Sequence, residues 1–183
     1  MALSRKQQGV LRGMALGAAI TVALIAVGIL LNPFSFSPDL SVSQRISIAI
    51  QSAGVLGICL AAAVGRLATH RFFTPEDIDG GGLHRGSDRA ILLQSLLQNT
   101  LEQAVLATLV YLAWAVTMPA TWLSVVPLAA MSFAIGRILF FRGYGKGAPA
   151  RALGFTMAFY PSVAMLICIA VVAAASLGAP GAP

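Results

Sequence analysis

The feature that most constrains this chain is a series of long segments that carry no charge. Residues 13–31, 46–65 and 152–177 contain no Asp, Glu, Lys or Arg, and Glu102 is the one charged residue within 90–136. A helix of about 20 apolar residues crosses the ~30 Å hydrocarbon core of a bilayer, and the stretch 90–136 is long enough for two crossings. The sequence therefore predicts an all-α integral membrane protein with five spanning helices.

The overall composition excludes a water-soluble domain, because 58% of the residues are hydrophobic and only 10% are charged. Ordinary globular chains carry about 25% charged residues. The break within the longest stretch is placed at residues 117–122, since Pro119 lacks an amide donor and disfavours helix in the residue before it. The predicted helices cover residues 9–31, 44–70, 88–117, 121–143 and 150–177.

The first apolar segment has a second interpretation as a signal peptide, because Arg5 and Lys6 precede it. Its apolar run is longer than the core of a typical signal peptide, and no convincing small-residue cleavage site follows it. These two observations favour a retained transmembrane helix. The absence of targeting segments and the usage rich in Ala, Gly and Arg favour a bacterial inner membrane.

The basic residues predict the orientation in the membrane. They border the N-terminus and two of the loops: Arg5, Lys6, Arg12; Arg66, Arg71, Arg85, Arg89; and Arg137, Arg142, Lys146, Arg151. Only Arg45 falls on the opposite side, so the positive-inside rule places the N-terminus and both basic loops in the cytoplasm. Because membrane spans separate these charges, the net charge of +6 indicates anionic lipid headgroups or an anionic ligand and not nucleic acid.

Other reactive side chains give weaker signals. Cys59 and Cys168 lie in apolar helices and are interpreted as packing residues. His70 and His84 have no second ligand at metal spacing, so no metal site is predicted. The glycine-rich loop 71–88 is interpreted as a solvated linker, with Ser87 or the residue after it capping the next helix.

The carboxylate of Glu102 marks the first candidate site, because a charged side chain inside a membrane helix is costly and is by default functional or paired. Ser95, Asn99 and Gln103 lie at helical spacing from one another and near Glu102, and they form a polar stripe. The stripe has two interpretations. It lines a binding site, or it joins helices or subunits by hydrogen bonds between them.

The end of the fourth predicted helix is the second candidate site. Arg137, Phe140 and Tyr144 share a helical face, and Arg137 lies inside the membrane boundary, where it needs a counter-charge. Glu102 is the expected partner. A basic rim follows, formed by Arg142, Lys146 and Arg151; plain positive-inside topology also explains it. Together the two candidate sites predict a pocket open to the cytoplasm, in which a small anionic, amide-rich molecule meets a lipid-soluble one.

Two segments resemble the MAPEG family, the membrane-associated proteins of eicosanoid and glutathione metabolism. The first is Gln-Asn-Thr-Leu-Glu-Gln at 98–103; the second is Arg-Ile-Leu-Phe-Phe-Arg-Gly-Tyr at 137–144, followed by Pro-Ala-Arg-Ala-Leu-Gly-Phe at 149–155. The resemblance implies a four-helix transmembrane bundle over residues 44–178. An additional N-terminal transmembrane helix and an external loop occupy 1–43, and a short tail occupies 179–183.

The resemblance also implies a homotrimer that binds glutathione, a co-substrate and not a metal cofactor, between subunits near the cytoplasmic face. Asn99 and Glu102 match positions that hold the glutathione backbone. Arg137 and Tyr144 match a glutathione-contacting arginine and a tyrosine seven residues further on. Arg151 matches the arginine that stabilises the glutathione thiolate in active members, and it is the catalytic candidate.

The chain departs from the family pattern at three positions. Ser95 stands where many members have Arg, and Gln103 and Phe140 stand where glutathione-using members have Tyr. Each departure removes a cation or a hydroxyl that could hold glutathione. Gln103, Phe140 and Arg142 are candidate supporting residues of the site. Arg142 or Arg89 is the candidate to replace the lost contacts with glutathione.

Three functions follow from these observations. The leading hypothesis is a glutathione-dependent transferase or peroxidase that conjugates or reduces lipophilic electrophiles arriving from the bilayer. The alternative is a non-catalytic binding or assembly protein on the same scaffold, in which the polar stripe secures the oligomer and the basic rim binds lipid. A transporter is less favoured, because the sequence has one buried carboxylate and no pair of broken helices.

Overall fold

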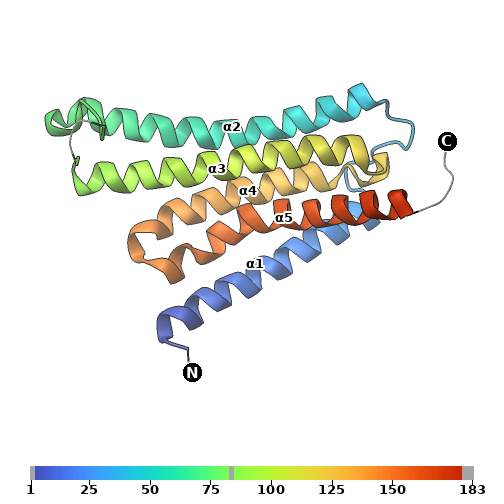
Figure 1. Ribbon diagram of the computed structural model, residues 1–183, viewed down its shortest axis with the longest axis horizontal. Coiled ribbons are helices and arrows are strands. Elements are labelled where there is room, and N and C mark those ends of the chain that lie inside the picture. Colours follow the sequence, from blue (N-terminus) through green and yellow to red (C-terminus); the bar gives the residue numbers. More distant parts are fainter. Residues whose placement is uncertain (1–2, 83–84, 179–183) are drawn as a thin grey trace.

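The protein is all-helical in the computed structural model, which describes residues 3–82 and 85–178. The described chain forms α1 (Arg5–Leu30), α2 (Val42–Phe73), α3 (Asp88–Thr117), α4 (Val125–Gly143) and α5 (Ala148–Gly178), with 3₁₀ turns at Pro75–Asp77, Ala120–Trp122 and Tyr144–Lys146 (Figure 1). All five long helices are apolar enough to cross a membrane. The predicted all-α membrane fold is confirmed. The predicted tail 179–183 and His84 lie outside the described residues.

Local capping signals set several helix starts. The Ser4 and Ser41 hydroxyls each accept a hydrogen bond from the backbone amide three residues further on, and the side-chain oxygen of the glutamine at that position accepts one from the serine amide. Ser87 caps α3, as predicted. The largest differences from the predicted starts are four residues, at Arg5 (predicted 9) and at Val125 (predicted 121). The Ser-x-x-Gln pattern explains why α1 begins earlier than its apolar run.

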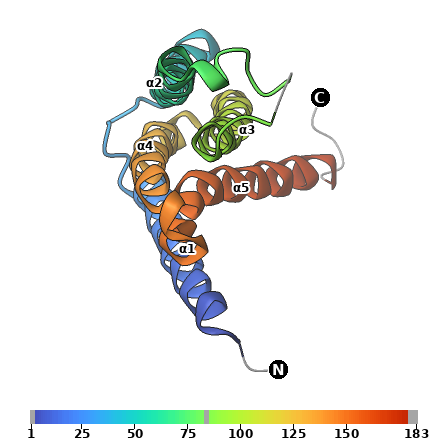
Figure 2. The ribbon, with the colours of Figure 1, turned by 90° about the vertical axis from the view of Figure 1, so that its left-hand side faces the viewer.

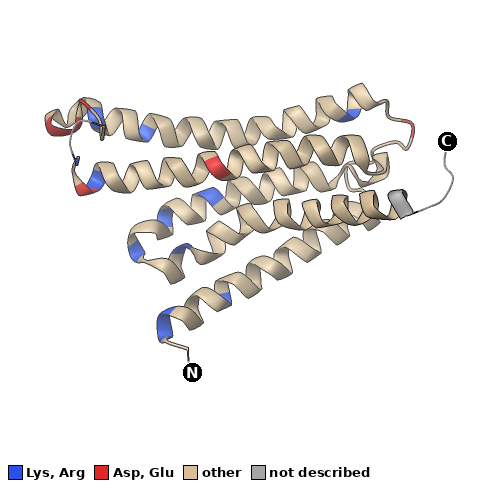
Figure 3. Ribbon diagram, viewed as in Figure 1, with Lys and Arg blue, Asp and Glu red and all other residues tan. Residues whose placement is uncertain are grey.

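The two ends of the helix bundle differ in charge (Figure 3). The N-terminus, the α2–α3 connection and the α4–α5 turn lie at one end, where the Lys and Arg residues gather. We call this the basic end. Among the described residues Arg45 is the basic residue at the other end, where its guanidinium donates to the Met118 carbonyl. The predicted separation of charge is confirmed, and which side of the membrane the basic end faces stays a prediction.

Helices α4 and α5 approach each other backbone to backbone. A Cβ added at Gly154 would lie 2.3 Å from the Phe140 amide nitrogen, and one added at Gly143 would lie 2.3 Å from the Ala150 carbonyl oxygen. Only glycine permits this distance, as is usual where membrane helices pack closely. The close approach fixes the end of α4 against the start of α5, the two segments that carry the candidate residues.

Helix α1 packs against α5 through a row of glycines that we call the glycine seam: Gly9, Gly13 and Gly17. Added Cβ atoms would lie 2.8 Å from the Pro149 Cβ, 2.8 Å from the Ala152 Cβ and 2.0 Å from the Thr156 Oγ1, respectively. The Thr156 hydroxyl donates to the Gly13 carbonyl at 3.3 Å. Figure 2 shows α1 alongside α4 and the first part of α5, on the side of the bundle away from α2.

Candidate functional site

A buried arginine organises the inside of the bundle. The Arg137 side chain is 1% exposed. Its Nη1 donates to Asn99 Oδ1 at 2.8 Å and its Nη2 donates to Gln103 Oε1 at 2.9 Å, so the fork of the guanidinium joins α4 to two successive turns of α3. The guanidinium also lies over the rings of Phe133 and Phe140, 5.5 and 4.5 Å from their centroids. The planar fork and the stacking faces are both specific to arginine.

The expected pairing of Arg137 with Glu102 is wrong. Glu102 is exposed on the outer face of α3, where its carboxylate accepts a hydrogen bond from Gln98 Nε2 at 2.8 Å. Two neutral amide oxygens accept from the Nη atoms of the arginine instead. The error has a geometric cause: adjacent residues of a helix point about 100° apart, so Gln103 faces inward while Glu102 faces outward.

The two departures from the family pattern that lie beside Arg137 have a structural explanation. Gln103 supplies one of the two amide oxygens that accept from the guanidinium, and Phe140 supplies the nearer stacking ring. Both side chains are buried against Arg137. They therefore hold the arginine side chain in place. Arg137 Nε is buried without a hydrogen-bond partner among the described residues.

A pocket of about 400 Å³ lies at the basic end, between α1, α3, the end of α4 and the start of α5. We call it the α5 pocket. Its polar lining includes Asn99, Tyr144 and Arg151, and the Arg151 guanidinium lies 4.4 Å from the Tyr144 ring centroid. Its volume lies within the range of ~300–1,000 Å³ usual for ligand pockets. The remaining lining residues are mostly apolar: Val10, Met14, Phe140, Ala148, Ala152, Phe155, Thr156 and Tyr160.

The structure thus brings together only part of the predicted site. Asn99, Tyr144, Arg151 and Phe140 line the α5 pocket, and Arg137 lies behind Asn99. Glu102, Gln103 and Arg142 are not among the lining residues, and Arg142 is exposed.

Sequence reasoning missed the apolar part of this pocket. Ala148 and Phe155 lie three residues before and four residues after Arg151, so helical spacing places them on the same face as Arg151 and could have found them. Val10 and Met14 of α1 gave no such signal, because only the packing of α1 against α5 brings them to the pocket.

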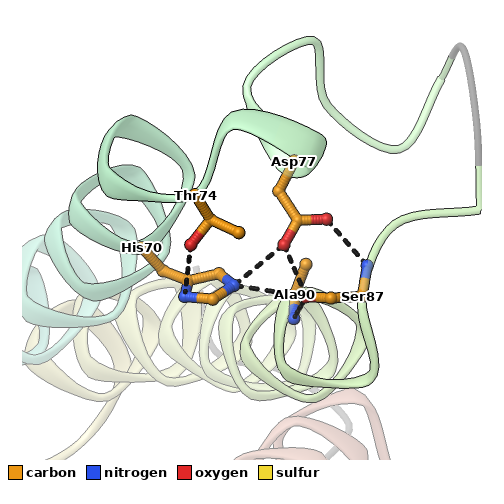
Figure 4. Close-up of polar contacts among 5 residues, drawn as sticks. All are labelled: His70, Thr74, Asp77, Ser87 and Ala90. Atoms are coloured by element: carbon orange, nitrogen blue, oxygen red, sulfur yellow. Dashed lines mark hydrogen bonds and ion pairs between the residues drawn. The ribbon is translucent and has the colours of Figure 1, made fainter.

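Most described residues of the α2–α3 connection are exposed, as predicted for a solvated linker, but one carboxylate in it is buried. Asp77 is buried, and its carboxylate accepts hydrogen bonds from the Ser87 amide at 2.7 Å and from the Ser87 hydroxyl, while His70 Nε2 lies 2.9 Å from it (Figure 4). The Thr74 hydroxyl lies 3.4 Å from the other ring nitrogen of His70. The bonds from Ser87, and then His70, hold the pKa of Asp77 below its ordinary value. This cluster ties the end of α2 to the start of α3.

The geometry defines a class of protein. It is a helical integral membrane protein with an amphipathic pocket, in which an arginine, a tyrosine and an asparagine amide face apolar side chains. Such a pocket can hold an anionic polar molecule beside a lipid-soluble one, since the guanidinium matches carboxylates and the apolar walls match hydrocarbon.

Comparison with known proteins then gives the family. The model of the MAPEG family matches residues 47–171, about two thirds of the chain, and the chain belongs to this family. The match begins within α2, so α1 precedes it. No curated protein and no solved structure is similar enough to match the chain.

Proposed function

We propose that this protein is a glutathione-dependent transferase or peroxidase that acts on lipophilic electrophiles. The observation that carries the proposal is the joint presence of Arg151, Tyr144 and Asn99 in one pocket with apolar walls. Glutathione is an anionic peptide, and membership of a family of glutathione and eicosanoid metabolism favours it over other anions.

Each polar residue has a distinct role in this proposal. Arg151 is the cation that stabilises the glutathione thiolate, and Tyr144, stacked beneath it, fixes its position. Asn99 uses its amide oxygen for Arg137, so its amide nitrogen remains available for a carboxylate or carbonyl of the peptide. Arg137 then acts as a positioning residue, because it orients Asn99 from behind the pocket.

The proposed reactions balance with glutathione and the acceptor alone. In conjugation, the thiolate sulfur forms a bond to the electrophilic carbon, and the leaving group departs with the electron pair of the bond that breaks. In reduction of a hydroperoxide, two glutathione molecules become one disulfide, and the O–O bond is cleaved to give an alcohol and water. The acceptor arrives through lipid, and glutathione arrives from the aqueous side.

We also propose that the protein works as a homotrimer, with the number taken from the family resemblance. An exposed Glu102 in the middle of a spanning helix is unfavourable against lipid. A second chain packed on this face would cover Glu102 and the neighbouring exposed Gln94 and Gln98, since such side chains join membrane helices by hydrogen bonds. Because Glu102 faces away from the α5 pocket, its predicted role in holding glutathione requires a ligand shared between two chains.

The same outward-facing polar residues favour the alternative of a non-catalytic assembly protein, and one experiment separates the two functions. Arg151→Ala should abolish the ultraviolet absorbance of the bound thiolate and the conjugating activity, while the oligomer stays intact by size-exclusion chromatography. Lys146→Ala is the matched control, because Lys146 is an exposed cation five residues before Arg151 and outside the pocket lining. Full activity in Arg151→Ala would contradict the proposed mechanism.

A further inference from the structure

One wall of the α5 pocket comes from a helix outside the family match. Val10 and Met14 lie on α1, whereas every other lining residue lies between Asn99 and Tyr160, within the matched residues 47–171. The pocket is therefore shaped in part by α1, which lies outside the family match.

This wall is held firmly in place. The glycine seam lies beside Val10 and Met14 on the same helix, and it brings the α1 backbone into contact with Ala152 and Thr156. Both of these α5 residues also line the pocket, and the Thr156 hydroxyl bonds to the Gly13 carbonyl. The contacts that fix α1 are thus continuous with the pocket lining.

The shape of the pocket indicates what the wall contacts. Its α5 lining runs from Ala148 to Tyr160, about 18 Å along the helix at 1.5 Å per residue. Of the α5 lining residues, Arg151 is the charged one and lies near the start, while Ala152, Phe155 and Tyr160 continue away from it. An elongated molecule with its reactive or charged end at Arg151 would place its apolar body against Phe155 and Met14.

We propose that α1 determines acceptor specificity through Met14, which lies between the levels of Ala152 and Thr156 on α5 and limits the space for the apolar part of the electrophile. The preferred class is an electrophile with an unbranched alkyl chain. This inference rests on the proposed function, because it names the acceptor for the same site.

The test compares Met14→Trp, Met14→Ala and a control, Leu16→Trp. Leu16 is exposed on the same helix and is not a lining residue. Turnover is measured with glutathione and a series of 2-alkenals of increasing chain length, in which the thiolate sulfur adds to the β-carbon and a proton adds to the α-carbon. Binding of a long-chain fluorescent carboxylate is measured separately, without glutathione.

We expect Met14→Trp to raise the KM for the longest alkenals about tenfold or more relative to the KM for the shortest, the scale of one misfitted group in an apolar pocket. Met14→Ala should shift the preference toward longer or bulkier chains. Leu16→Trp should match the unmodified protein. The inference would be overturned if the dependence of KM on alkenal length were the same in Met14→Trp and Leu16→Trp, and if Met14→Ala did not change it.

The two assays separate failure of this inference from failure of the proposed function. In one outcome the unmodified protein binds the fluorescent carboxylate but no glutathione, and of the two tryptophan variants only Met14→Trp weakens the binding of the carboxylate. The role of α1 in binding apolar chains is then supported, and the glutathione reaction is refuted. If turnover occurs and neither assay responds to Met14, the role of α1 is refuted and the glutathione reaction stands.

Discussion

We predict that adding a side chain to the glycine seam forces α1 away from α5. In Gly17→Ala the new Cβ would lie 2.0 Å from the Thr156 Oγ1 and 2.5 Å from the Thr156 Cβ. The hydroxyl can rotate away, but the Cβ cannot, and carbon atoms pack at about 3.5–4.0 Å. Helix α1 must therefore move away from α5 by about 1 Å or more, the difference between these distances.

The loss of folding free energy in Gly17→Ala is obtained by comparison with Gly54→Ala in α2. Nothing lies within 4 Å of a Cβ added at Gly54. Both changes gain about 1 kcal/mol of helix propensity, so this contribution cancels in the comparison. The difference that remains is the overpacking cost at Gly17, typically about 1–3 kcal/mol. Gly17→Ala should be the less stable variant by that amount, although alanine favours a helix at both positions.

The assay is reversible unfolding of the purified protein in mixed micelles, from which the free energy of unfolding of each variant is obtained. A double variant, Gly17→Ala with Thr156→Gly, removes the clashing Cβ and should recover most of the loss as a coupling energy between the two sites. The reasoning is refuted if Gly17→Ala and Gly54→Ala are equally stable, or if the double variant shows no coupling.

Three further predictions concern the polar contacts. Arg137→Gln should destabilise the bundle by about 1–3 kcal/mol in the same unfolding assay, because the Asn99 and Gln103 oxygens lose a buried donor. Asp77→Asn should loosen the α2–α3 connection. Since the folded pKa of Asp77 is lowered, its contribution is full above the ordinary pKa of about 4 and is lost as pH falls through the folded value. In the unmodified protein, protection of the Ser87 amide from hydrogen exchange should fall as the Asp77 carboxylate is protonated. In Asp77→Asn this pH-dependent loss of protection should be absent. Glu102→Ala should weaken the oligomer in size-exclusion chromatography, while Arg45→Ala, at the opposite end, should not.

The sequence was sufficient to predict the helices, because uncharged stretches of membrane-spanning length leave few alternatives. The start of α3 followed from Ser87, and the stretch 90–136 divides near Pro119, as predicted. The start of α1 was placed too late, since the prediction followed the apolar run and overlooked the capping box at Ser4.

The candidate site was harder to predict because it depends on which way each side chain points. Asn99 and Arg151 could be placed from motif and spacing. The rotation of α3 about its axis could not be predicted from the sequence. This rotation turns Gln103 toward Arg137 and turns Glu102 away from it. The contribution of Met14 was also inaccessible, since it depends on tertiary packing between helices far apart in the chain. The burial of Asp77 was missed for the same reason.

The most direct test of the central claim is equilibrium binding of glutathione to the purified, detergent-solubilised protein. Saturable binding that is weakened in Arg151→Ala and in Arg137→Ala, and retained in Lys146→Ala, is the predicted result, because the first two remove the pocket cation and the support of Asn99. An absence of glutathione binding in the unmodified protein, or equal weakening in all three variants, would contradict it.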